Sequence, residues 1–331
     1  MADQLRSIYF RKQYGFPRAH FQQHRETLAT EKGDVTIAFV SLRDPRSLVP
    51  KQACFAFATV SRPRALLEYA IPFLGGATVP RQPSNTPLLI NDFPPKVRQA
   101  ILDIEERLDA TTISFAKSLR WRCNAHGTAH VFHSIDLAPY FWSLDQHKWF
   151  PVYGSSSFES IEWQFEYVDS ILEPEDGPPE LLPDEPLAFE LLMEAQQLQY
   201  DNPRSALVIA VAAAESGTKR CIEFINPGLA GVLFSHESPP IVDLLDLYYP
   251  KDHFARIVPS IREQLTKAVS ERNRLLHAGT FSLKRAQIRR RLRAIEDLLR
   301  LFDIVMGYTW AEKFLSSNTR VELGLPTLDL P

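Results

Sequence analysis

Hydrophobic positions follow two different periods along the chain, and the period changes near residue 173. Runs of β-branched and aromatic residues at 34–42 and 53–60 predict strands. Apolar residues spaced three and four apart between Pro95 and Trp121 predict a helix. We therefore expect an α+β N-terminal domain. Its further expected elements are a short helix at 63–74 and strands at 129–135, 147–153 and 159–168.

The C-terminal region has a helical period. Asn202 followed by Pro203 is a strong helix start, because the side chain can cap the first turn and proline suits the first helical position. Short turns join the expected helices, apart from one loop of about thirty residues, so the pattern predicts an all-α four-helix bundle. The helices are expected at 187–200, 203–224, 261–277 and 283–314, the last of them long and amphipathic.

The boundary between the two regions is the acidic, proline-rich segment EPEDGPPELLPDEP at 173–186. Its five prolines and its lack of periodicity are typical of a linker. The predicted organisation is an α+β domain at 1–172, this linker, a helical bundle at 187–315 and a tail at 316–331. The bundle includes the region with the clearest candidate chemistry, whereas the N-terminal domain is expected to recognise or sense a ligand.

Composition narrows the class of protein. Of 331 residues, 45% are hydrophobic and 23% are charged, which excludes a disordered chain. No stretch approaches the roughly 18 apolar residues of a membrane span, and the N-terminus lacks the apolar segment of a signal peptide. Three widely spaced cysteines do not form a disulfide scaffold. We expect a cytoplasmic protein without a membrane partner.

The net charge of −3 conceals two opposite segments. Residues 159–190 contain eleven acids and no Lys or Arg, whereas residues 251–293 contain twelve Lys and Arg and three acids. Such a basic segment in a nearly neutral chain is either a solvated helix face or a contact surface for a polyanion.

The third expected helix, PSIREQLTKAVSERNRLLHAG, carries polar residues beside its apolar stripe. Arg272 lies near the centre of that stripe, where a charge is costly unless it is paired. Glu215 of the second helix is a plausible partner, which would make Arg272 a purely internal residue. Asn273 and His277 are four residues apart and therefore share one side of the helix.

The segment RNRLLHAG, with Arg272, Asn273 and His277, resembles the RNxxxH motif of HEPN domains. The two preceding helices, with Glu215 in the second, are also similar to the opening helix pair of that family. The resemblance covers about 185–315. It implies a homodimeric endoribonuclease that forms a 2′,3′-cyclic phosphate, with both motifs in one cleft. It further implies catalytic roles for Arg272, Asn273 and His277, support from Glu215, and a toxin-like or defence effector.

These residue types suit RNA cleavage without a metal or cofactor. A histidine can take a proton from a ribose 2′-OH at neutral pH, and an arginine can stabilise the charge that develops on the phosphate. The cations at the start of the fourth helix oppose the helix dipole, so contact with the RNA backbone explains them better than stability does. The expected RNA-binding residues are Arg274, Lys284, Arg285, Arg289, Arg290, Arg291 and Arg293.

Three alternatives remain. In the first, the HEPN-like domain is a non-catalytic module that binds nucleic acid or nucleotide for regulation or assembly. An exposed His277 beside an open cleft would favour catalysis. The aromatic residues of the N-terminal region either pack a core or stack on bases. Finally, a weakly matching zinc set would make the N-terminal domain a zinc enzyme, the other interpretation being a turn with surface histidines. That set is Cys123, His126, His130 and His133.

Overall fold

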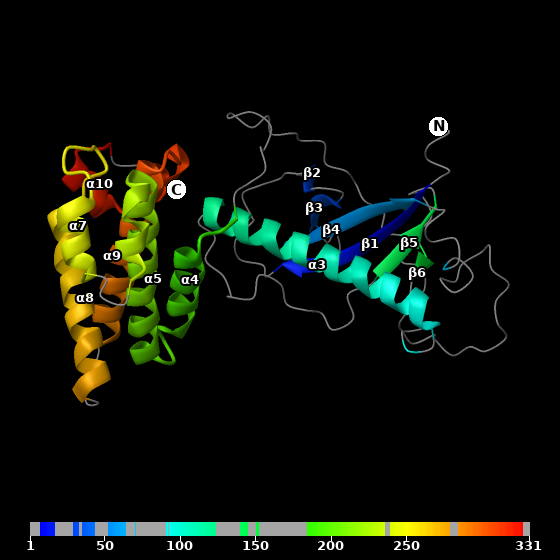
Figure 1. Ribbon diagram of the computed structural model, residues 1–331, viewed down its shortest axis with the longest axis horizontal. Helices are drawn as coiled ribbons and strands as arrows, with labels where there is room; N and C mark the ends of the chain where they lie inside the picture. Colours follow the sequence, from blue (N-terminus) through cyan, green and yellow to red (C-terminus); the bar gives the residue numbers. More distant parts are fainter. Residues whose placement is uncertain are drawn as a thin grey trace. The chain divides into compact units, whose positions relative to one another are not determined.

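The computed structural model divides the chain into two compact units (Figure 1). The first comprises Met1–Leu119 and His130–Asp184, and the second Arg120–Ala129 and Glu185–Pro331. No helix in the part of the chain that the structure describes is long and apolar enough to cross a membrane. The structure describes residues 7–16, 29–32, 35–43, 52–63, 70, 91, 93–123, 140–144, 150–151, 184–235, 239–278 and 284–326.

The first unit contains an antiparallel sheet of six strands in the order β2-β3-β4-β1-β5-β6. The strands predicted at 34–42 and 53–60 are confirmed as β3 and β4, whereas β1, β2 and β5 were not anticipated. Strand β1 alternates buried Ile8 and Phe10 with more polar residues, a pattern too short to stand out before Lys12. The strands are β1 Ser7–Phe16, β2 Ala29–Lys32, β3 Val35–Arg43, β4 Gln52–Pro63, β5 Tyr140–Ser143 and β6 Phe150–Pro151.

Helix α3, Pro95–Cys123, confirms the helix predicted from Pro95 to Trp121. Its apolar residues at three- and four-residue spacing are buried, and on another side Glu105 and Asp109 bind Lys12 of β1. The last turn, from Arg120, belongs to the second unit. The other elements predicted for the N-terminal region, at 63–74, 129–135 and 159–168, lie almost entirely outside the described residues, as does most of 147–153.

The second unit is helical, as predicted. Asn202 caps α5 by accepting a hydrogen bond from the backbone N–H of Ser205 at 3.2 Å, and Pro203 is the first helical residue. The predicted thirty-residue loop contains short helices. The elements are α4 Leu187–Leu198, α5 Pro203–Ile225, η3 Pro227–Leu229, α6 Ala230–Leu233, α7 Ile241–Tyr248, α8 Pro259–Ala278, α9 Arg285–Val305, η4 Thr309–Phe314 and α10 Ser317–Leu323.

Helices α4, α5, α8 and α9 share one apolar core, with α5 in contact with the other three. The small residues of α5 permit this close packing. At Gly217 the approach is closest, because a Cβ atom there would overlap Leu299 Cδ2 of α9 and lie 3.4 Å from the Ala188 Cβ of α4. Glycine at this position is therefore a packing requirement rather than a helix break.

Helix α9 differs from its prediction, because every residue from 294 to 304 is buried, including four charged ones. The helix lies among α4, α5, α8 and η4, so its second half has no solvated face. The guanidinium of Arg300 lies over the rings of Phe189, Trp310 and Phe314, at 4.3, 5.5 and 5.3 Å from their centroids. The amphipathic prediction is thus correct only for the first turns of the helix.

The end of the predicted bundle also needs correction. The fourth helix stops at Val305 rather than near 314, and Gly307 turns the chain with a φ of 95° before η4 begins. The predicted tail contains α10, whose Thr319 hydroxyl donates to the buried Asp297 carboxylate at 2.7 Å. The N-cap residue of α10, Ser316, donates its backbone N–H to the same carboxylate at 2.9 Å. The helical unit therefore extends to about residue 326.

Candidate functional site

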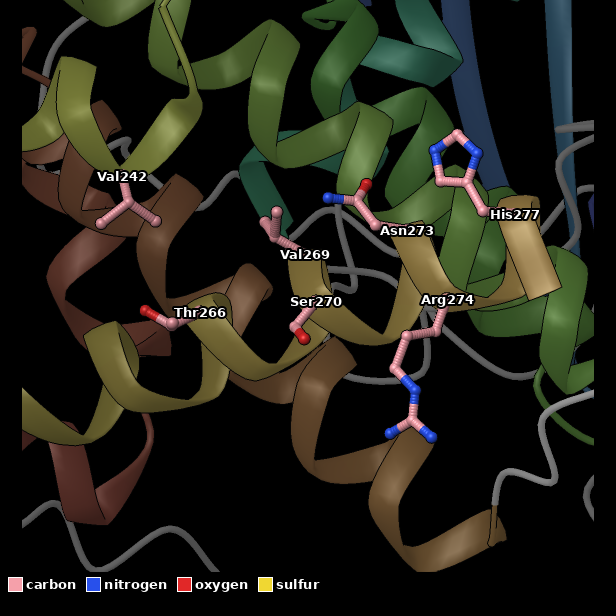
Figure 2. A pocket seen from close by; sticks show the side chains of 7 residues that line it. All are labelled: Val242, Thr266, Val269, Ser270, Asn273, Arg274 and His277. Carbon is pink, nitrogen blue, oxygen red and sulfur yellow. The ribbon is translucent and has the colours of Figure 1, made fainter.

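The exposed side of α8 lines an open hollow of ≈ 540 Å³. Two residues of the motif, Asn273 and His277, lie on this side and are exposed, since the core contacts of α8 lie on its other faces. Figure 2 shows Asn273 and His277 directed to the same side of the helix, while Arg274 extends away from them. The sequence thus correctly placed Asn273 and His277 together, and the structure adds that both are open to a ligand.

The hollow is completed by residues that sequence analysis did not select. Thr266, Val269 and Ser270 precede the motif on α8, and Val242 comes from α7 (Figure 2). The four- and three-residue spacing of Thr266, Ser270, Asn273 and His277 could have revealed the polar stripe on one helix face. Val242 could not have been found, because its helix lies in a segment predicted to be a loop.

The third motif residue, Arg272, lies on a different face of α8 and does not line the hollow. Its guanidinium forms an ion pair with Glu215 of α5, as the sequence suggested. Both side chains are partly exposed, at 24% for Arg272 and 40% for Glu215. The Nε atom of Arg272 is buried without a hydrogen-bond partner among the described residues. Glu215 therefore holds a guanidinium whose hydrogen-bonding capacity is not fully used.

Within one copy of the chain, Arg272 and His277 project to different sides of α8. They are five positions apart, which places their side chains about 140° apart around the helix. His277 faces the hollow and Arg272 faces α5. An isolated helix therefore offers an exposed imidazole and amide on one side and an anchored guanidinium on another.

The structure divides the predicted RNA-binding residues into two groups. Lys284, Arg285, Arg289 and Arg290 are exposed in the first turns of α9, and Arg274 is exposed near the end of α8. Among the residues that the structure describes, no carboxylate forms an ion pair with Arg285 or Arg289. These side chains give the α8–α9 end of the unit an exposed positive surface.

Arg291 was predicted to bind RNA, but the structure places it in an ion pair between α8 and α9. Its side chain is buried, and its Nη2 and Nε atoms lie 2.9 and 3.1 Å from the carboxylate of Glu271 on α8. Gln264 accepts a third hydrogen bond from the same guanidinium. Arg293 is half-exposed, and it donates to Glu296 at 2.9 Å and to the Phe314 carbonyl at 3.4 Å. Arg291 thus joins two helices instead of facing a ligand.

The zinc candidates Cys123, His126, His130 and His133 are not placed by the structure. The three histidines lie outside the described residues, and the side chain of Cys123 is not described. Across the described ranges, no group of three or more His, Cys, Asp or Glu residues has the geometry to hold a metal ion.

Because Asn273 and His277 are exposed, the α8 hollow can act chemically on a bound ligand. A solvated imidazole can exchange protons with a bound hydroxyl, and the neighbouring Asn273 amide can both donate and accept hydrogen bonds. The nearby cations can hold a polyanion.

Comparisons of the chain with protein-family models, with curated proteins and with solved structures find no match.

Proposed function

We propose that α4, α5, α8 and α9 form a four-helix bundle of HEPN type that cleaves RNA without a metal ion. The observation that carries this proposal is the exposure of His277 and Asn273 on one side of α8, beside an open hollow. A histidine in this position is accessible to a substrate, unlike one packed in a core.

In the proposed reaction, His277 takes the proton from a ribose 2′-hydroxyl. The 2′-oxygen then attacks the adjacent phosphorus, and the bond to the 5′-oxygen of the next nucleotide breaks. That 5′-oxygen takes a proton from water, the protonated His277 returns its proton to the solvent, and the other product is a 2′,3′-cyclic phosphate. Arg272 stabilises the negative charge on the phosphoryl oxygens, and Asn273 orients the phosphate or the imidazole.

The separation of Arg272 and His277 around α8 supports a homodimeric site. In a symmetric dimer, each α8 faces its own copy near the two-fold axis. His277 of one protomer and Arg272 of its partner can then converge on one phosphate, which the same two residues of a single helix cannot do. The hollow beside α8 would become part of the shared cleft.

The second candidate function is a non-catalytic module that binds RNA or a nucleotide. The Arg272–Glu215 ion pair favours it, because an arginine satisfied within its own chain has less capacity for a transition state. We prefer catalysis because the same pair also fixes the guanidinium, and a charge that is already held in place needs no reorganisation as the transition state forms.

Incubation of purified protein with total RNA in EDTA tests the proposal. We expect cleavage that leaves 2′,3′-cyclic phosphate ends and that is lost in His277→Ala. His253→Ala is the matched control, since His253 bonds the backbone of its own loop through Nδ1, 3.1 Å from Ala255 N. Cleavage that stops in EDTA and returns with Mg²⁺ would contradict the proposed mechanism. Binding of RNA without any cleavage would favour the non-catalytic module.

A further inference from the structure

A second hollow, of ≈ 330 Å³, lies between the end of α4 and the start of α9. Tyr200, which is 53% exposed, stands at its edge just after α4. Arg289, exposed and without a carboxylate partner in the described ranges, faces it from α9. The lining of the hollow therefore includes an exposed aromatic ring and an exposed cation.

Four other residues of the hollow are held by hydrogen bonds within the chain. Glu296 accepts a hydrogen bond from Arg293 at 2.9 Å and another from Gln196 at 3.5 Å. Gln199 donates to the backbone carbonyl of Gln196 at 2.8 Å. Gln197 and Leu292 complete the lining, in which Tyr200 is the exposed aromatic ring and Arg289 the exposed cation.

The chemistry of these two residues matches a nucleotide of single-stranded nucleic acid. An exposed aromatic ring beside a cation is the combination that stacks a base and holds its phosphate. A base inside a duplex is already stacked and cannot lie on Tyr200 without unpairing. A small anion without a base would bind the arginine but would not stack on the ring.

The position of this hollow relates it to the α8 site. Helix α9 contacts the helices that carry both hollows, because Arg291 binds Glu271 of α8 at 2.9 Å while Glu296 accepts a hydrogen bond from Gln196 of α4. Figure 1 shows that α4 and α8 both finish, and α5 and α9 both start, at the same end of this unit. His277 in the last turn of α8 and Arg289 in the first turns of α9 therefore lie toward the same end of the unit.

We infer that the hollow formed by Tyr200 and Arg289 is a subsite for an unpaired nucleotide of the substrate, so that the enzyme acts on single-stranded RNA. This inference rests on the proposed ribonuclease function and specifies its substrate class. Tyr200 stacks on the base, and Arg289 holds the adjacent phosphate.

The test measures binding of a short labelled single-stranded RNA, and of the same sequence as a duplex, to protein carrying His277→Ala. Adding Tyr200→Ala should weaken single-strand binding by roughly 5- to 100-fold, the loss typical of one stacked base. Tyr200→Phe keeps the ring and should keep the affinity. Phe224→Ala is the matched control, because Phe224 is 58% exposed and lies near the other end of α5.

Arg289→Ala should lower both the affinity and its dependence on salt, by about one phosphate contact. Binding of duplex RNA should not respond to Tyr200→Ala. Single-strand affinity unchanged in Tyr200→Ala, or an equal loss for duplex and single strand, would overturn the subsite. If that result accompanies RNA cleavage by the unmodified protein, only this inference fails. If the unmodified protein neither binds nor cleaves RNA, the proposed function fails with it.

Discussion

The indole N–H of Trp121 donates a hydrogen bond to the carboxylate of Asp303, with 2.9 Å between Nε1 and Oδ2. Both residues are buried, and they are 182 positions apart in the chain. Arg300 lies on the same carboxylate at 3.5 Å and donates to the Trp121 carbonyl at 3.0 Å. The end of α3 is therefore part of the polar core of the helical unit rather than a spacer that precedes this unit.

Replacing Trp121 with phenylalanine should lower the free energy of unfolding by roughly 1–3 kcal/mol or more, because Asp303 loses a donor while buried. Chemical denaturation followed by circular dichroism measures the change. Tyr308→Phe is the control, since the Tyr308 ring packs edge-on against Trp121 and needs no hydroxyl to do so. An equal cost for both variants would show that the hydrogen bond does not matter.

Burial raises the pKa of the Asp303 carboxyl to about 6, although Arg300, the Trp121 indole and Arg220 pull it down. The folded chain thus holds a proton that the unfolded chain releases near 3.8. The contribution of Asp303 to the free energy of unfolding should be largest below pH 3.8 and should fall as the pH rises from there through about 6. The difference between the natural protein and Asp303→Asn should decline by roughly 3 kcal/mol over that range. A pH-independent difference would refute the assignment.

Gly217→Ala should destabilise the helical unit by about 1–3 kcal/mol, even though alanine favours helices, because its Cβ would overlap Leu299. Gly231→Ala is the matched control, because a Cβ at Gly231 meets no atom within 4 Å. Thermal unfolding of both variants measures the effect. A Gly217→Ala variant as stable as the natural protein would mean that α5 and α9 can separate without cost.

Arg291→Ala should cost roughly 3–5 kcal/mol, because it leaves the carboxylate of Glu271 largely buried without its cation. Arg290→Ala should change stability by less than about 0.5 kcal/mol, since Arg290 is exposed. RNA binding by the two folded variants, titrated at several salt concentrations, separates the roles. If Arg291→Ala folds normally and loses only RNA affinity, our assignment of a structural role is incorrect.

Mixing His277→Ala protomers with Arg272→Ala protomers tests the shared cleft of the proposed ribonuclease. Each variant alone should lose most turnover, and mixed dimers should recover measurable cleavage, because one of their two sites keeps both residues. The melting temperature of Arg272→Ala must be compared first, because removing Arg272 also unpairs Glu215. Full cleavage by a monomer in solution would contradict this version of the mechanism.

Local pattern predicted those parts of the fold that depend on neighbours along the chain. The helix from Pro95, the cap at Asn202 and the polar pair Asn273–His277 all follow from spacings of one to four residues. Strand β1 was missed because its alternation is weak after Phe10, and its partners β4 and β5 lie far away in the sequence. Strand pairing is a long-range property that no short window contains.

The charged residues of α9 mark the limit of sequence-based inference. By itself, the sequence determined the helical period, the caps, the excess of positive charge and the side of α8 that carries Asn273 and His277. Only the tertiary structure decided which charges meet solvent. Arg291 is buried in an ion pair with Glu271, and Arg300 is buried in an ion pair with Asp303. Arg289, by contrast, is exposed and lines the same hollow as Tyr200. The physical reason is that a charged side chain loses its hydration when another element packs over it and keeps its hydration when none does. Here those covering elements are α8, η4 and the last turn of α3, all of which lie outside the few neighbouring residues that set the helical period of α9.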